Sequence, residues 1–172
     1  MSPNKLSDAE LTTLILEQEK TLQFPRFTFD DAFTIGSALR ANFLKNPAWE
    51  NRGLVISIST FTGHTLFVTA VGNDAEAVAN NWLWVEAKKR VVARFNHSSF
   101  YVGRKLAAEG KTPEDAGLHF PEFAPHGGAF PVYIKGSTVA PVAVIIVSGL
   151  PQEEDHQLVV DTLTDIIPKM GA

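Results

Sequence analysis

Cysteine is absent from the 172 residues of this sequence. Disulfide bonds, thiolate catalysis and metal sites with sulfur ligands are therefore excluded, and any bound metal would need histidine and carboxylate ligands. The same absence is compatible with a reducing compartment.

Long apolar runs and an excess of basic residues are also lacking. No segment approaches the ~18 uninterrupted apolar residues of a transmembrane helix, and the first residues do not have the basic and apolar regions of a secretory signal. The chain carries 15 Lys and Arg against 19 Asp and Glu, a net charge of -4, whereas binding to nucleic acid needs a basic surface. We expect a cytoplasmic protein that binds neither a membrane nor nucleic acid.

Recognised catalytic motifs are missing as well. The sequence has no phosphate-binding loop of the GxxxxGKS type, no GxGxxG after a strand, no HExxH and no GxSxG. Any reaction would have to depend on residues that no short motif identifies.

The chain does contain clear secondary-structure patterns. Ser7 and Glu10 have the spacing of a capping box, and Asn73 or Asp74 can cap a long helix. Periodicity predicts helices over about 7–22, 30–46, 74–95, 99–108 and 151–166, strands over 53–60, 64–71, 130–135 and 139–148, and a long loop over 109–128. Residues 141–147 are apolar throughout and indicate a central strand, whereas Pro131 indicates an edge strand or a strand start. This order predicts the α+β class, with helices packed against one antiparallel sheet.

The long third helix has lysines on its apolar face. The residues expected to share that face are Val78, Trp82, Val85, Val92 and Phe95. At about 100° per residue, Lys88 and Lys89 fall within the same arc. Because an ammonium group is not buried alone, each lysine must reach the sheet edge, pair with a carboxylate, or face an anionic ligand.

Three polar signatures stand where helices or strands meet loops, the positions at which binding sites are usually built. They are Arg94–Ser99, His126–Gly128 and Ser148–His156. Imidazole exchanges protons near neutral pH, and paired glycines let the backbone approach a bound group. Each signature also has a structural interpretation. The serines can cap a helix, the histidine–glycine stretch can be a simple turn, and the acidic residues suit a helix N-terminus.

Several stretches resemble the GlcG- and HbpS-like family, which carries the label haem-degrading domain, and within it the OrfY-type branch. The resemblance covers about residues 25–168 of a single domain spanning 1–172, with helix 7–22 outside this core. It is carried by Trp84 with Lys88-Lys89, Arg94-Phe95, His97–Tyr101, His126–Ala129 and Ser148–His156.

The resemblance implies a profilin-like fold, assembly through dimers into larger homo-oligomers, and pockets near subunit contacts. Relatives have been linked to haem or corrinoid binding, which makes haem the candidate cofactor. The sequence departs from the family pattern at two places that concern haem binding. Ala87 stands where relatives often carry a basic residue, and no histidine precedes His64, so the N-terminal haem ligand of some relatives is missing.

We therefore expect a homo-oligomeric protein that binds a small ligand, either haem or another anionic molecule, in one shared pocket. No metal site is expected. The residues expected to form the pocket are Trp84, Lys88, His97, Ser98, His126, Gly127, Gly128, Ser148, Asp155 and His156.

Two alternatives stay open. One is a small-molecule isomerase or hydrolase in which His97 or His126 is the general acid or base. The other is a protein-interaction or assembly factor whose exposed aromatic residues Phe24, Phe27 and Trp49 bind a partner.

Overall fold

The computed structural model describes residues 5–73, 75–137 and 139–171, and within these ranges the side chains of 75–78 are not described. The helices are α1 (Asp8–Thr21), α2 (Phe29–Lys45), α3 (Ala75–Phe95), α4 (Ser99–Ala108) and α5 (Gln152–Ile166). The strands are β1 (Gly53–Ser59), β2 (Thr65–Gly72), β3 (Ala129–Val132) and β4 (Ala143–Ser148). Across these ranges no helix is both long enough and apolar enough to cross a membrane.

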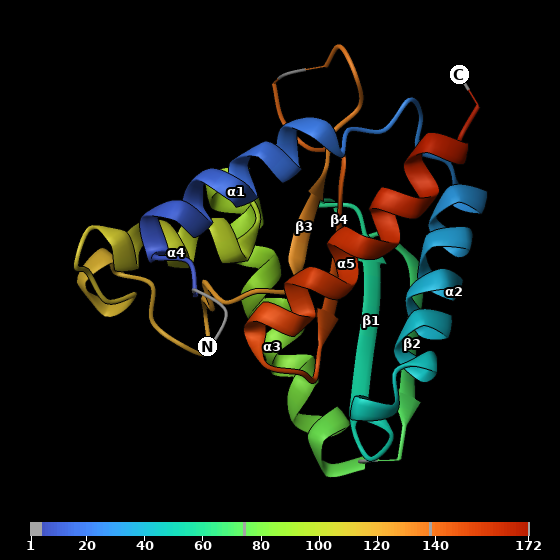
Figure 1. The fold of residues 1–172 in the computed structure, drawn as a ribbon, viewed down its shortest axis with the longest axis horizontal. Coiled ribbons are helices and arrows are strands. Elements are labelled where there is room, and N and C mark those ends of the chain that lie inside the picture. Colours follow the sequence, from blue (N-terminus) through green and yellow to red (C-terminus); the bar gives the residue numbers. More distant parts are fainter. Residues whose placement is uncertain (1–4, 74, 138, 172) are drawn as a thin grey trace.

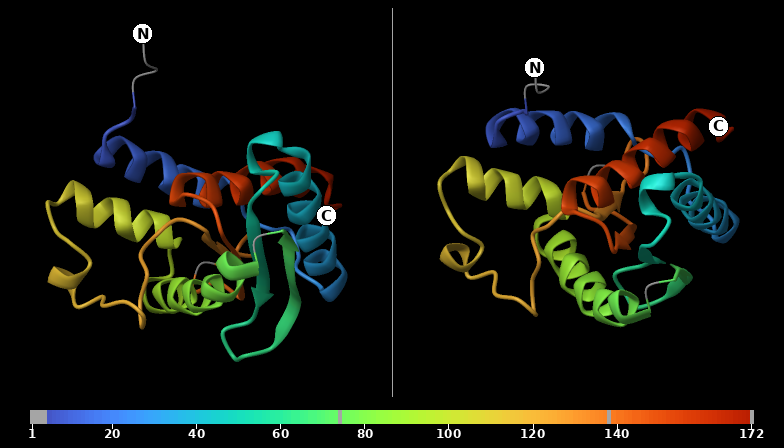
Figure 2. Two further views of the ribbon diagram at one scale, coloured as in Figure 1. Left: turned by 90° about the horizontal axis from the view of Figure 1, so that it is seen from below. Right: turned by 60° about the horizontal axis from the view of Figure 1, so that its bottom comes forward.

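The four strands form one antiparallel sheet in the order β2-β1-β4-β3. Helices α2 and α5 cover one face and α3 covers the other, while α1 packs on α4 beside the sheet (Figures 1 and 2). This arrangement confirms the predicted α+β class with helices packed against an antiparallel sheet. Strand β4 is buried throughout in the sheet interior, and β3, which contains Pro131, is an edge strand, as predicted.

Local capping signals set the helix starts. Ser7 and Glu10 form the predicted capping box at α1. Helix α2 begins one residue earlier than expected, because Thr28 and Asp31 form a second capping box. Asp74, one of the two predicted caps of α3, lies outside the described residues.

The main hydrophobic core lies between the sheet and helices α2 and α5. Phe24 is fully buried in it, so the expected exposure of this ring to a partner is wrong, whereas Phe27 and Trp49 are partly buried and pack against the core. The chain path explains this burial. The backbone of Phe24 is hydrogen-bonded on both sides to the segment after β3, and Trp49 stacks on Phe43 with ring centroids 5.8 Å apart.

The buried face of α3 differs in part from the expected one. Val85 and Val92 are buried against the sheet, but Trp82 and Phe95 are 39% and 37% exposed, and the side chain of Val78 lies outside the described residues. The buried arc includes Lys88, which faces β4 and α5, and it extends to Ala87 and Val91, where the 109–128 loop and α4 pack on the helix. Phe95 lies at the C-terminal end of α3, where less chain covers it.

The 109–128 loop is packed along α3. Its Leu118 is buried with Val91 of α3, and the backbone N–H of Ala124 donates to the carbonyl of Ala87 at 3.2 Å. These contacts carry the end of the loop, and with it His126, to the side of α3 that bears Trp84 and Lys88.

Candidate functional site

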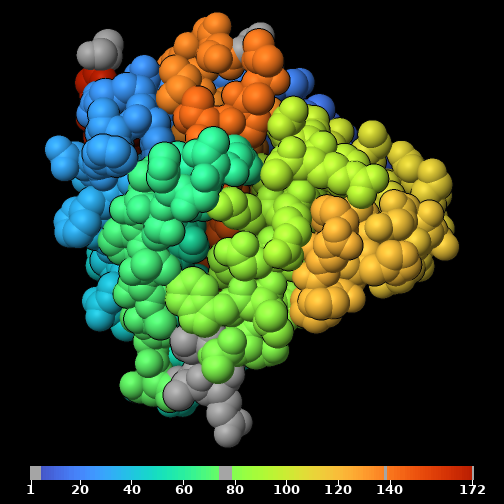
Figure 3. All heavy atoms as spheres, turned by 180° about the vertical axis from the view of Figure 1, so that it is seen from behind, coloured from blue at the N-terminus to red at the C-terminus, as the bar shows by residue number. Residues whose placement is uncertain are grey.

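A cavity of about 320 Å³ lies between α3, the His126 turn and the start of α5. Figure 3 shows the molecule from the α3 side, where atoms of the C-terminal part of the chain are visible in a hollow beside this helix. Five predicted site residues line the cavity together: Trp84, Lys88, His126, Ser148 and Asp155. The remaining lining residues are Asn81, Gly149, Leu150 and Gln152.

The turn between β4 and α5 brings Asp155 to this cavity. Gly149 has a φ of +152°, and a Cβ there would lie 2.1 Å from the carbonyl oxygen of Gly53, so the turn requires glycine. Pro151 is the N-cap of α5 rather than its first helical residue. Asp155 Oδ1 accepts from the backbone N–H of Leu150 at 3.1 Å, which fixes the carboxylate in the first helical turn. The helix dipole favours a negative charge at that place.

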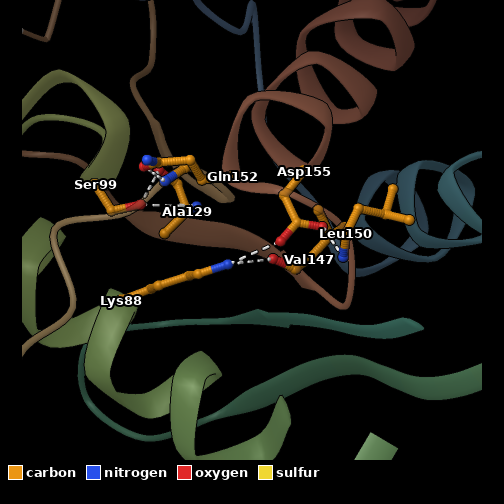
Figure 4. A network of polar contacts seen from close by, with 8 residues as sticks. Lys88, Ser99, Ala129, Val147, Leu150, Gln152 and Asp155 are labelled. Atoms are coloured by element: carbon orange, nitrogen blue, oxygen red, sulfur yellow. Dashed lines mark hydrogen bonds and ion pairs between the residues drawn. The ribbon is translucent and has the colours of Figure 1, made fainter. Parts of the chain in front are cut away.

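Lys88 reaches from α3 to this carboxylate (Figure 4). Its Nζ donates to Asp155 Oδ2 at 3.0 Å and to the carbonyl of Val147 at 3.2 Å, and both side chains are only 3% exposed. Of the open possibilities for Lys88, the structure therefore contains the carboxylate pair. Burial raises the pKa of Asp155 to about 6, in spite of the opposing effect of Lys88.

The side chain of Lys89 contacts a different part of the sheet from that of Lys88. Its Nζ donates to the hydroxyl of Ser59 at 2.9 Å, at the end of β1. This lysine is partly buried and does not line the cavity.

The paired glycines let the backbone pass close to Lys88 and α5. A Cβ at Gly128, whose φ is +133°, would lie 2.7 Å from Lys88 Nζ, and one at Gly127 would lie 2.0 Å from the carbonyl oxygen of Gln152. The next residue is fixed from α4, because the Ala129 N–H donates to Ser99 Oγ at 3.1 Å (Figure 4). These two glycines therefore fit the backbone between the lysine and the helix, but neither lines the cavity itself.

His126 and Trp84 form the outer wall of the cavity. Their rings meet edge to face with centroids 5.4 Å apart, and Phe120 packs on Trp84 at 4.7 Å. Burial, and to a smaller extent the Lys88 ammonium, lowers the pKa of His126, whereas a hydrogen bond with Gln152 acts in the opposite direction. The imidazole is therefore neutral at pH 7.

Asn81 is the residue at this cavity that the sequence interpretation missed. It is 8% exposed, and its Nδ2 has no hydrogen-bond partner in the part of the chain that the structure describes. It lies seven residues before Lys88, almost two helical turns, so both side chains share one face of α3. This spacing was the signal that could have identified it.

His97 and Ser98 lie outside this cavity, although they were expected in it. Both contact Glu19 of α1: His97 Nδ1 is 2.6 Å from its Oε2, and the Ser98 N–H donates to its Oε1 at 2.7 Å. The hydroxyl of Ser98 caps α4 by accepting from the Tyr101 N–H. His97 and Ser98 lie away from the cavity because α1 packs on α4 and brings the buried carboxylate of Glu19 to the start of α4. His97 lines a second cavity instead.

His156 is also close to the predicted site without lining it. Its side chain is buried between the rings of Phe100 and Phe130, and its Nε2 lies 2.8 Å from Gln18 Oε1 of α1. Burial lowers its pKa to about 3, so the ring is neutral in the folded protein. His156 therefore fixes the contact between α5 and α1.

The cavity offers hydrogen-bond donors rather than a metal site. Within the described ranges, no group of three or more histidine, aspartate or glutamate residues could hold a metal ion. Lys88 uses two of its three N–H donors on Val147 and Asp155, and Asn81 has an unused amide. Such a set can bind an oxygen-bearing ligand, and the neutral imidazole of His126 can accept a proton at the cavity wall.

Sequence comparisons identify the family. The model described as haem degrading protein HbpS-like matches residues 27–164. The chain belongs to this family. A UPF0303 protein of Rhizobium etli is 38% identical over 156 residues, which are 90% of this chain and 88% of the relative. A UPF0303 protein of Streptomyces coelicolor is 40% identical over 152 residues, 88% of this chain and 90% of that protein.

Solved structures agree with this membership. The crystal structure of Ybr137w protein superposes with a TM-score of 0.83 at 34% identity, covering 93% of this chain and 90% of that one. A Streptomyces reticuli HbpS double mutant gives a TM-score of 0.57 at 21% identity, covering 84% of this chain and 89% of the other. The latter is a similarity of fold alone.

Proposed function

We propose that this protein binds a small molecule with a carboxylate or similar oxyanion in the cavity beside α3. The observation that carries the proposal is the buried Asn81 Nδ2, which lines the cavity and has no partner among the described residues. A buried donor without an acceptor costs about 1–3 kcal/mol, and proteins rarely contain one that serves no purpose. A ligand oxygen would satisfy this amide.

Lys88 supplies a second donor to the same ligand. Two of its N–H groups are used by Val147 and Asp155, and the third is available for the ligand. Because Asp155 already compensates the charge of Lys88, recognition depends on donors held at fixed positions more than on net charge. The proposed site is completed by Trp84, His126, Gly127, Gly128 and Ser148.

Asp155 gives the proposed binding a pH dependence. Its pKa is raised to about 6, so acidification through this value leaves Lys88 without an anionic partner. The affinity for an anion should therefore rise as the pH falls from 7 to about 5, above the ordinary pKa of a carboxylic acid ligand. His126, whose pKa is lowered, is the other titratable group at the cavity, and its protonation acts in the same direction.

Haem does not fit this cavity. Its volume of about 320 Å³ is at the lower end for small-molecule sites, and most of its lining is polar, whereas a macrocycle needs broad apolar walls. Its one histidine, His126, is engaged with Gln152 and Trp84. The donor set of Asn81 and Lys88 suits a much smaller polar molecule.

A proton-transfer reaction is the second candidate function, and one observation favours it. Asp155 has a raised pKa and His126 a lowered one, and both line the same cavity. Groups that exchange protons near neutral pH are those that general acid–base catalysis requires. A small-molecule isomerase or hydrolase of this kind would show a bell-shaped pH–rate profile that His126→Ala abolishes.

Titration calorimetry at pH 6 with acetate, glycolate, malonate and haem tests the binding proposal. We expect one of the three acids to bind, and Asn81→Ala to weaken that binding by roughly tenfold. The matched control is Asn80→Ala, which removes an exposed amide from the neighbouring position and should change nothing. Equal affinities in the two variants would remove the site from consideration.

Family membership also supports assembly into a homo-oligomer. We expect one built from dimers, which light scattering coupled to size exclusion measures. A cytoplasmic location stays a proposal from the sequence alone, and fractionation of the source cells measures it.

A further inference from the structure

The second cavity, which contains His97, is not explained by the proposed function. It has a volume of about 420 Å³ and lies between α4, the end of α3 and the 109–128 loop. Its floor is apolar and includes Val102, Leu106 and Leu118. Its other lining residues include two cations, Arg94 and Lys105.

The two cations have no carboxylate partner within the described residues. Neither Arg94 nor Lys105 makes an ion pair there, whereas Glu109, the acidic residue lining the cavity, pairs with Lys111 at 3.3 Å. Glu19, which pairs with His97, is buried at 6% exposure and is not among the residues that line the cavity. Among the residues that line the cavity, the two cations therefore outnumber the one carboxylate.

Arg94 is held in place without using its hydrogen-bonding capacity on an acidic group. Its guanidinium lies over the rings of Phe95 and Phe123, at 5.3 and 5.4 Å from their centroids. Cation–π contacts of this kind position the planar group and leave its N–H donors free, and these match the two oxygens of a carboxylate.

His97 is likewise positioned by its surroundings. Glu19 holds Nδ1 at 2.6 Å, and Tyr101 packs on the ring with centroids 4.4 Å apart. A carboxylate on one ring nitrogen fixes the orientation of the imidazole and leaves the other nitrogen for a ligand. Nε2 has no hydrogen-bond partner in the described ranges, on a ring that lines the cavity.

We infer that this cavity is a second binding site, separate from the one beside α3, for a small amphipathic carboxylic acid. The carboxylate lies between Arg94 and Lys105, the His97 ring forms part of the wall beside it, and the apolar body covers the Val102–Leu106–Leu118 floor. Charge complementarity selects an acid over a neutral molecule of the same shape, and the apolar floor selects it over short polar acids.

The test uses 1-naphthoate as the probe and 1-naphthalenemethanol as its uncharged counterpart. Saturable binding of 1-naphthoate is expected, with roughly tenfold weaker binding in Arg94→Gln and in Lys105→Gln, each of which removes one charge. Lys20→Gln is the matched control, because Lys20 is exposed on α1 and pairs with Glu17 outside the cavity. Its affinity should equal that of the unmodified protein.

Nuclear magnetic resonance locates the probe. On addition of 1-naphthoate the ring signals of His97 should shift, and those of His119, an exposed histidine of the loop, should not. Asn81→Leu should leave the affinity unchanged, so the result is independent of the cavity beside α3. Equal binding of the uncharged probe, equal affinities in all three charge variants, or loss of binding in Asn81→Leu would each overturn the inference.

Discussion

The substitution Asn81→Leu tests whether the Asn81 amide stabilises the fold or serves to bind a ligand. Leucine has nearly the shape of asparagine but places a methyl group where Nδ2 lies. In the absence of ligand, this removes a buried donor that has no partner in the described chain. Relief of that desolvation is worth about 1–3 kcal/mol. Leucine's better helix propensity adds a few tenths of a kcal/mol.

We therefore expect the free energy of unfolding of Asn81→Leu to exceed that of the unmodified protein by about 1–3 kcal/mol. Urea denaturation at pH 7.5 measures it, and the thermal midpoint should rise by roughly 2–4 °C for each kcal/mol. The control is Asn80→Leu, an exposed neighbour on α3 that gains only the helix-propensity contribution. A variant less stable than this control by more than about 1 kcal/mol would show that the amide holds the fold together, and would refute the reasoning.

Three further changes test other parts of the account. Lys88→Met should lower the free energy of unfolding by about 3–5 kcal/mol, because it leaves Asp155 buried and unpaired. Adding Asp155→Asn should recover most of this loss. Purely additive effects of the two substitutions in a double-mutant cycle would show that the two side chains do not interact. Gly128→Ala should cost more than about 1 kcal/mol, since its φ is +133° and its Cβ would meet Val147 O, whereas Gly171→Ala should cost nothing measurable by the same denaturation assay. His156 has a pKa of about 3 folded against 6.5 unfolded, so the folded state binds fewer protons between these values and stability falls on acidification. From pH 7 to 5 the free energy of unfolding of the unmodified protein should fall by about 2 kcal/mol more than that of His156→Leu. Parallel plots of unfolding free energy against pH for the two proteins would contradict this expectation.

Features with local causes could be predicted from the sequence. The Ser7–Glu10 capping box and the start of α4 at Ser99 depend on neighbouring residues, and both were placed correctly. The interior position of β4 followed from its continuous apolar composition. The early start of α2 had the same kind of local signal, the Thr28–Asp31 spacing, which was not used.

Features that depend on how distant segments dock could not be predicted. The pattern on α3 required a partner for Lys88 but could not identify Asp155, 67 positions away. His97 was assigned to the wrong cavity because the packing of α1 on α4, which brings Glu19 to it, leaves no pattern in the sequence. The shifted buried arc of α3 has the same origin, because α4 and a loop rather than the sheet cover part of that helix.

The most direct test of the central claim is the side-chain amide signal of Asn81 in a ¹⁵N-labelled sample at pH 6, followed during titration with the best-binding small acid. The account predicts that the Nδ2 protons of Asn81 shift downfield to saturation as they gain an acceptor, while the amide of the exposed Asn80 stays in place. An Asn81 amide signal that does not move while the acid binds elsewhere on the protein would contradict it.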